Sequence, residues 1–155
     1  MLKVLHVVPS FWPATKWGGP IFSTLAICDG VAALGDVEIR VLPTNAGGPD
    51  RKDNLLINDK TVDFENGYQV TYAHRILGRD FSPELLSLLV PYMRQADMVH
   101  LTATYSFPTI PTLAVAKALD KPVLWSPREA IQARQEWRGA SSKSKLLFEG
   151  LCKLF

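Results

Sequence analysis

The pattern of hydrophobic and polar positions alternates along the chain between short apolar runs and stretches with helical spacing. Residues 2–8 are apolar and β-branched without alternation, which is typical of a strand buried on both faces in a parallel sheet. Apolar positions at helical spacing run from Ile21 to Leu34, and residues 37–43 form a second apolar run. A strand, a helix and a strand within about 40 residues predict a right-handed βαβ unit.

Further along, the same pattern predicts a hairpin and two more strands. Residues 61–64 and 68–72 flank an Asn66-Gly67 turn, and we expect the second arm to join the main sheet. Residues 97–102 and 122–125 are predicted as the remaining strands.

Capping signals delimit the helices. Gly35 follows the first helix as its predicted C-terminal cap. Ser82 is a predicted N-cap, followed by Pro83 at the first position and Glu84 in the first turn. Pro91 is expected to kink that helix. Further helices are predicted over residues 108–119 and from Ser141 onward.

This order of elements predicts one α/β domain over residues 1–155, a doubly wound, Rossmann-like parallel sheet. Ligands of such folds bind at the carboxyl ends of the strands. The candidate functional residues therefore follow strands.

The loop after the first strand, residues 9–20, is the first candidate. Gly18 and Gly19 are followed by Pro20, which suits the first helical position. Bare glycines at a helix N-terminus suit an anionic ligand, although they could also only permit a turn. The loop matches neither the dinucleotide fingerprint nor the ATP P-loop.

Polar residues follow two later strands. Thr102 and Thr104 could bond a sugar or only cap the next loop and helix. Arg128 could hold a phosphate or carboxylate with its planar fork, or could only form a surface pair with Glu129.

Aromatic and imidazole side chains allow more than one interpretation. Phe11, Trp12 and Trp17 could stack on sugar rings or pack over a sheet edge. His6 is predicted to be structural, and His100 is predicted as a core histidine bonded to backbone.

Composition narrows the classes of function. A net charge of +2 does not suggest a nucleic-acid partner. Cys28 and Cys152 are predicted as buried free thiols in a reducing compartment. No signal peptide, membrane span or metal-ligand spacing is found, so we predict a cytoplasmic domain without metal or cofactor.

Several segments together resemble the N-terminal domain of GT-B glycosyltransferases, specifically the retaining family 4. They are Val4 to Pro9, Gly18-Gly19-Pro20, Leu34-Gly35-Asp36-Val37-Glu38, Asp97-Met98-Val99-His100 and Pro122-Val123 leading to Ser126-Pro127-Arg128. The last is similar to members that build surface polysaccharides. The chain departs from the family pattern at Thr102, and after the fifth strand, where many members carry histidines.

The resemblance implies a transferase that takes a sugar from a nucleotide sugar without a metal. This domain would hold the glycan or lipid-linked acceptor, and a second domain, absent from this chain, would hold the nucleotide. The glycine loop would face the sugar diphosphate, whose developing charge its amides would stabilise. The two departures leave the catalytic residue unassigned, and the chain alone is expected to be inactive.

Two other classes remain open: a stand-alone binding or regulatory module, and the first domain of a GT-B sugar-nucleotide epimerase. The last helix adds a further choice. Leu147, Phe148, Leu151 and Phe155 form an apolar stripe among lysines. We predict that the sheet or a neighbouring chain covers it, the alternative being peripheral contact with an anionic membrane.

Overall fold

A single six-stranded sheet organises the chain. The computed structural model describes residues 1–50, 52–102, 104–128 and 141–155. The strand order is β3-β4-β2-β1-β5-β6. The strands are β1 (Leu2–Ser10), β2 (Val37–Thr44), β3 (Thr61–Asp63), β4 (Gln69–Thr71), β5 (Met98–Thr102) and β6 (Val123–Ser126). All neighbours pair in parallel except β3, which is antiparallel to β4.

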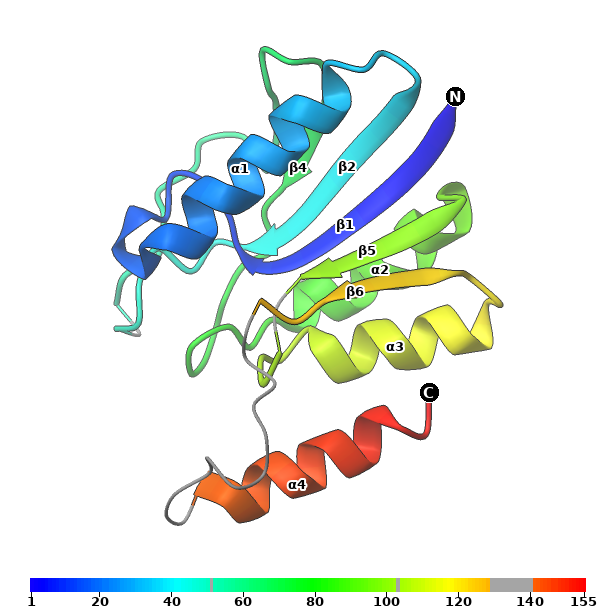
Figure 1. The fold of residues 1–155 in the computed structure, drawn as a ribbon. Helices are drawn as coiled ribbons and strands as arrows, with labels where there is room; N and C mark the ends of the chain where they lie inside the picture. The colour runs from blue at the N-terminus through cyan, green and yellow to red at the C-terminus, as the bar shows by residue number, and fades with distance from the viewer. Residues whose placement is uncertain (51, 103, 129–140) are drawn as a thin grey trace.

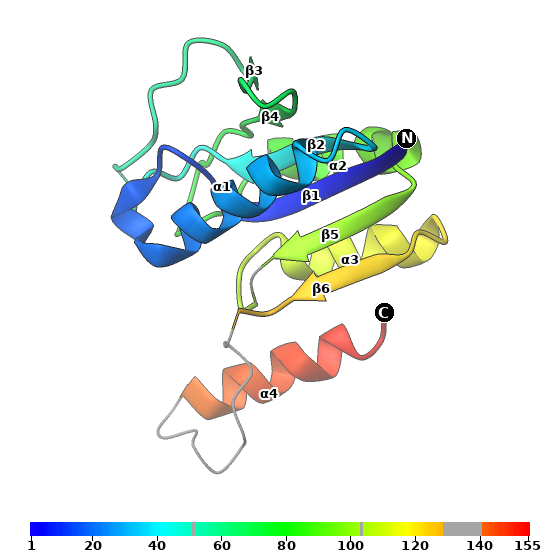
Figure 2. The same ribbon diagram turned by 45° about the horizontal axis from the view of Figure 1, so that its top comes forward.

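Helices cover both faces of this sheet, which confirms the predicted doubly wound α/β fold. α1 (Gly19–Ala32) lies on one face, and α2 (Pro83–Gln95) and α3 (Thr109–Ala118) lie on the other (Figures 1 and 2). A short 3-10 helix, η1 (Thr15–Trp17), precedes α1, and α4 (Ser141–Cys152) lies beyond β6 and α3.

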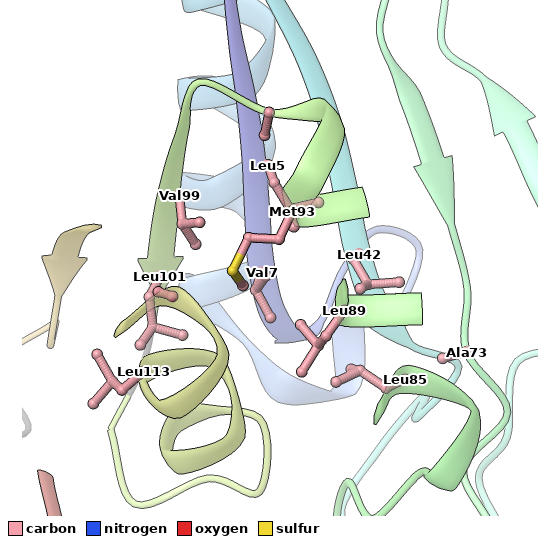
Figure 3. Close-up of a cluster of buried hydrophobic side chains, with 12 residues drawn as sticks. Leu5, Val7, Leu42, Ala73, Leu85, Leu89, Met93, Val99, Leu101 and Leu113 are labelled. Carbon is pink, nitrogen blue, oxygen red and sulfur yellow. The ribbon is translucent and has the colours of Figure 1, made fainter. Parts of the chain in front are cut away.

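The two faces of β1 explain why its apolar residues do not alternate. Leu5 and Val7 pack against α2 and α3 within the larger core cluster, together with Leu89 and Met93 (Figure 3). Val8, on the opposite face, belongs to a second cluster that includes Cys28 of α1. A strand with helices on both sides needs apolar side chains in both directions.

The predicted capping signals act as expected at α2. The Ser82 hydroxyl accepts a hydrogen bond from the Leu85 N–H at 3.1 Å. Pro91 lies inside α2, which continues to Gln95 as one helix. Gly35 has a φ of 78°, the left-handed conformation that glycine adopts without steric cost.

The apolar stripe of the C-terminal helix is not covered by the sheet, which was one of the two predicted covers; cover by a neighbouring chain remains a prediction. Phe148 packs on Tyr105 with ring centroids 5.0 Å apart, but the side chains of Leu147, Leu151 and Phe155 are exposed. The sheet therefore does not cover these three side chains; among the described residues, α4 meets the domain at Tyr105, at α3 and through Cys152 at the larger core cluster. Cys152, predicted to be buried, is half-buried at this contact, and both cysteines are free thiols.

Candidate functional site

A pocket of about 270 Å³ lies where the carboxyl ends of β1, β5 and β6 meet the N-terminal end of α1. This is the edge at which doubly wound folds bind ligands. The residues that line it are Val8, Pro9, Ser10, Trp17, Pro20, Ile21, Thr24, Arg79, Asp80, Thr102, Thr104, Tyr105, Ser106, Pro127 and Arg128.

The fold brings three of the six residues that the sequence analysis named as candidate binding residues to this pocket. Thr102, Thr104 and Arg128 all line it. Gly18 and Gly19 do not, but they lead directly into Pro20, which does. Glu129 lies outside the described residues. A role in binding remains a prediction for each of them.

The N-terminus of α1 is sterically open. Gly18 caps the helix with a φ of 75°, and its carbonyl accepts a hydrogen bond from the Ile21 N–H at 3.1 Å. A Cβ atom added to Gly18 or Gly19 would meet no atom within 4 Å. The positive end of the helix dipole is thus accessible beside the pocket.

Arg128 holds an unusual position at the pocket edge. Its φ is 53°, a left-handed conformation that is unfavourable for a residue with a Cβ. Its Nη1 donates to the Ser23 hydroxyl of α1 at 3.0 Å, whereas Nη2 is buried and has no partner among the described residues. A strained backbone that presents an unsatisfied charged donor is characteristic of functional sites.

Thr104 and Thr102 differ in their hydrogen bonds. The Thr104 Oγ1 is buried and has no partner in the described part of the chain. The Thr102 Oγ1 lies 2.8 Å from His6 Nε2 and 3.5 Å from His100 Nε2. The N-cap residue of α3 is Pro108, without a side-chain hydrogen bond, so neither threonine caps that helix.

Two charged residues of the pocket, Arg79 and Asp80, were not among the candidates predicted from the sequence. Both follow β4, and the carboxyl-end rule could have drawn attention to the segment that leaves this strand. The Arg79 guanidinium lies 5.2 Å from the centre of the Trp17 ring. The Asp80 Oδ2 accepts a hydrogen bond from the Phe107 N–H at 3.0 Å. Burial raises the pKa of the Asp80 carboxyl, and the Phe107 N–H and the nearby arginines oppose this shift.

A series of polar side chains is hydrogen-bonded around Thr102, which lines the pocket. His6 Nδ1 lies 3.3 Å from Cys28 Sγ, and His100 Nε2 lies 2.9 Å from Ser126 Oγ. The two imidazoles stack on each other, and Thr102 lies beside both. Burial lowers the pKa of both histidines, so both are mainly neutral at pH 7. His6 is buried and bonded on both ring nitrogens, in agreement with the structural role predicted for it, which stays a prediction. His100 bonds a side chain and not the backbone.

The aromatic residues of the first loop divide between two roles. Phe11 is fully buried and Trp12 packs on Phe22, so both serve packing. Trp17 lines the pocket, and its Nε1 donates to the Ala46 carbonyl at 3.0 Å. Of the three, only Trp17 lines this pocket, and the Arg79 guanidinium lies over its ring.

Comparison with known proteins gives a structural match and no sequence match. No family model matches the chain, and no curated protein matches it. Sucrose-phosphate synthase from Thermosynechococcus elongatus matches with a TM-score of 0.51 at 10% identity, over 98% of this chain and 40% of that chain. The fold resembles one half of a GT-B glycosyltransferase, and the chain spans well under half the length of the matched protein.

Proposed function

We propose that this chain is the N-terminal, acceptor-side half of a retaining GT-B glycosyltransferase of family 4. It would transfer a sugar from a nucleotide sugar to a glycan or lipid-linked acceptor during the synthesis of a surface polysaccharide. The pocket at the strand ends supports this most directly, because it joins an open helix N-terminus, hydroxyls and arginines in a GT-B-like fold.

The parts of the pocket suit different parts of such a reaction. The open N-terminus of α1 suits the donor diphosphate, since its partial positive charge favours the charge that develops on the leaving group. The ring of Trp17 and the Thr102 hydroxyl suit a sugar. At about 270 Å³ the pocket is close to the lower limit of roughly 300 Å³ for small-molecule sites, so it fits about one sugar ring.

A second domain completes the proposal. The matched structure is more than twice as long as this chain. The resemblance to GT-B enzymes implies that a second half would bind the nucleotide. We therefore expect nucleotide-sugar turnover only from a polypeptide that carries both halves.

The experiment measures nucleotide release from UDP-, GDP- and ADP-sugars by the two-domain polypeptide in the presence of a lipid extract. The proposal expects sugar transfer to a product in the lipid or glycan fraction from one of these donors, and no turnover by residues 1–155 alone. Release from no donor would refute it. Conversion of the donor into its epimer would identify an epimerase instead, and nucleotide-sugar binding by residues 1–155 alone would favour a stand-alone module.

A lipid-linked acceptor would require contact with a membrane. Within the described ranges, no helix is long and apolar enough to cross one. The α4 apolar surface, defined by Leu147, Leu151 and Phe155, is exposed beside Lys143 and Lys153, which are exposed as well. We propose that a cytoplasmic enzyme uses this surface for peripheral contact with anionic lipid.

A further inference from the structure

Two arginines line the candidate pocket, and neither forms a direct ion pair with a carboxylate in the described part of the chain. Arg79 comes from the segment after β4, and Arg128 from the segment after β6. In the described ranges the ion pairs are Lys3–Glu38, Lys16–Asp53 and Lys60–Glu84, and neither pocket arginine takes part in one. Two guanidinium groups in one small pocket repel each other unless an anion lies between or beside them.

Unsatisfied donors point to the same conclusion. Three buried side-chain polar atoms lack a partner among the described residues, and two of them, Arg128 Nη2 and Thr104 Oγ1, belong to pocket residues. Leaving a charged donor buried without a partner is costly, and a ligand oxygen would remove that cost. A guanidinium N–H and a hydroxyl are a donor pair suited to a phosphate or carboxylate.

Asp80 is the acid among the described residues that line the pocket, and it forms no ion pair with either arginine. Asp80 directs Oδ2 to the Phe107 N–H. Burial raises the pKa of Asp80 and so disfavours its charged form. Its remaining oxygen suits a sugar hydroxyl, since carboxylates accept such hydrogen bonds.

We propose that the acceptor sugar carries an anionic group, a phosphate monoester or a carboxylate, which Arg128, Thr104 and Arg79 bind in this pocket. This inference rests on the proposed function, and it adds the chemical class of the acceptor. Arg128 contributes Nη2, Thr104 contributes its hydroxyl, and Arg79 contributes charge from the opposite segment. A neutral acceptor would leave Arg128 Nη2 and the Thr104 hydroxyl without a partner.

Calorimetric titration of residues 1–155 with four probes tests the proposal. The probes are glucose 6-phosphate, glucuronate, neutral glucose and pyrophosphate, the last as a substitute for the donor diphosphate. We expect at least one of the two sugar anions to bind more than tenfold more tightly than glucose, and also more tightly than pyrophosphate.

Variants of pocket residues test whether the sugar anion binds in this pocket. Arg128→Ala should weaken the binding of the sugar anion by at least tenfold, the scale of a hydrogen bond to a charged group. Arg128→Lys should lose less because it keeps the charge, and Thr104→Val should weaken binding several-fold. Arg94→Ala is the matched control, because Arg94 is an exposed arginine in the last turn of α2. Circular dichroism verifies that each variant is folded.

Three results would overturn the proposal: sugar anions that bind no better than glucose, pyrophosphate that binds at least as tightly as both sugar anions, and binding insensitive to both Arg128→Ala and Thr104→Val. The second result would assign the arginines to the donor diphosphate. This titration involves no sugar transfer, so its failure is distinguishable from failure of the proposed function, which the transfer assay measures.

Discussion

The rings of His6 and His100 lie face to face, with centroids 4.1 Å apart and 12° between their planes. The two residues are direct neighbours in the parallel register of β1 and β5. Two stacked imidazolium ions would repel each other strongly at this distance. The arrangement therefore favours the neutral rings, which agrees with the lowered pKa of both side chains.

This pair predicts a loss of stability in mild acid. As the pH falls toward 6.5 and below, the two histidines bind protons in the unfolded chain but much less in the folded chain, where their pKa is lowered. The free energy of unfolding should therefore fall as the pH decreases from 7.5 to 5.5. Each unit of pKa depression is worth about 1.4 kcal/mol per histidine. Urea denaturation across this pH range measures the slope.

A matched pair of variants tests whether the stacked rings cause this pH dependence of the free energy of unfolding. His100→Gln removes one ring of the stack and should reduce the pH dependence. His74→Gln removes an exposed histidine on the segment after β4 and should leave it nearly unchanged. An equal slope in His100→Gln and the unaltered chain would contradict the prediction.

Much of the sheet follows from local patterns, because each element carries its own signal. The apolar run of residues 2–8 and the Ser82 cap are readable without knowledge of their neighbours, and the structure confirms both. The His6–His100 stack depends on the register between strands more than 90 residues apart. Similarly, Arg79 lies in a segment without periodicity, and only the folded chain brings it to Thr104 and Arg128.

Arg75 was also missed by sequence reasoning, and it predicts a large effect on stability. Its side chain is only 2% exposed, and it donates to Asn54 Oδ1 at 2.7 Å and to the carbonyls of Gly48 and Asp50 at 2.9 Å each. These bonds attach the loop after β2 to the segment that carries Arg79. Arg75→Met should lower the free energy of unfolding by about 3 kcal/mol or more, because it removes several hydrogen bonds of a buried guanidinium and leaves the buried Gly48 carbonyl without this donor.

Urea denaturation of Arg75→Met beside Arg94→Met checks this effect. Arg94 is exposed, and arginine and methionine have similar helix propensities, so the control should change stability by about 0.5 kcal/mol or less. Similar losses in the two variants would show that Arg75 does not hold the loop.

Gly19→Val should impair transfer by the two-domain enzyme while leaving the fold intact. An added Cβ meets no protein atom within 4 Å, so the side chain would extend into the space before the α1 N-terminus. A phosphate group could then no longer approach the helix end. Gly30→Val is the control, because Gly30 is an exposed residue of the same helix with equally open surroundings. Full turnover by folded Gly19→Val would refute the role of the loop.

Arg128→Ala should lower the kcat/KM of the two-domain enzyme by roughly tenfold to a thousandfold, the range expected for loss of a charge-assisted contact. The effect should persist across donor concentrations if the arginine binds the acceptor. Arg94→Ala provides the reference activity. An unchanged kcat/KM would show that Arg128 does not bind substrate and that its guanidinium only bonds Ser23.

The α4 apolar surface predicts salt-sensitive binding to anionic vesicles. Leu147 is 67% exposed and Phe155 is 45% exposed, and Lys143 and Lys153 lie near them on the same segment. Apolar insertion and attraction of lysines to anionic headgroups both favour binding, with about 1 kcal/mol for each lysine near the surface.

Co-sedimentation of residues 1–155 with phosphatidylglycerol vesicles, beside neutral phosphatidylcholine vesicles, measures this binding. We expect binding to the anionic vesicles only, and its loss as sodium chloride rises toward 1 M, where the Debye length is about 3 Å. Leu147→Asp should abolish it, because a carboxylate would enter both the apolar layer and the anionic field. Leu56→Asp is the matched control, since Leu56 is a leucine 99% exposed in the loop before β3. If Leu147→Asp and Leu56→Asp bind equally, or if neither vesicle type binds the chain, the α4 surface does not contact lipid and the membrane proposal is wrong.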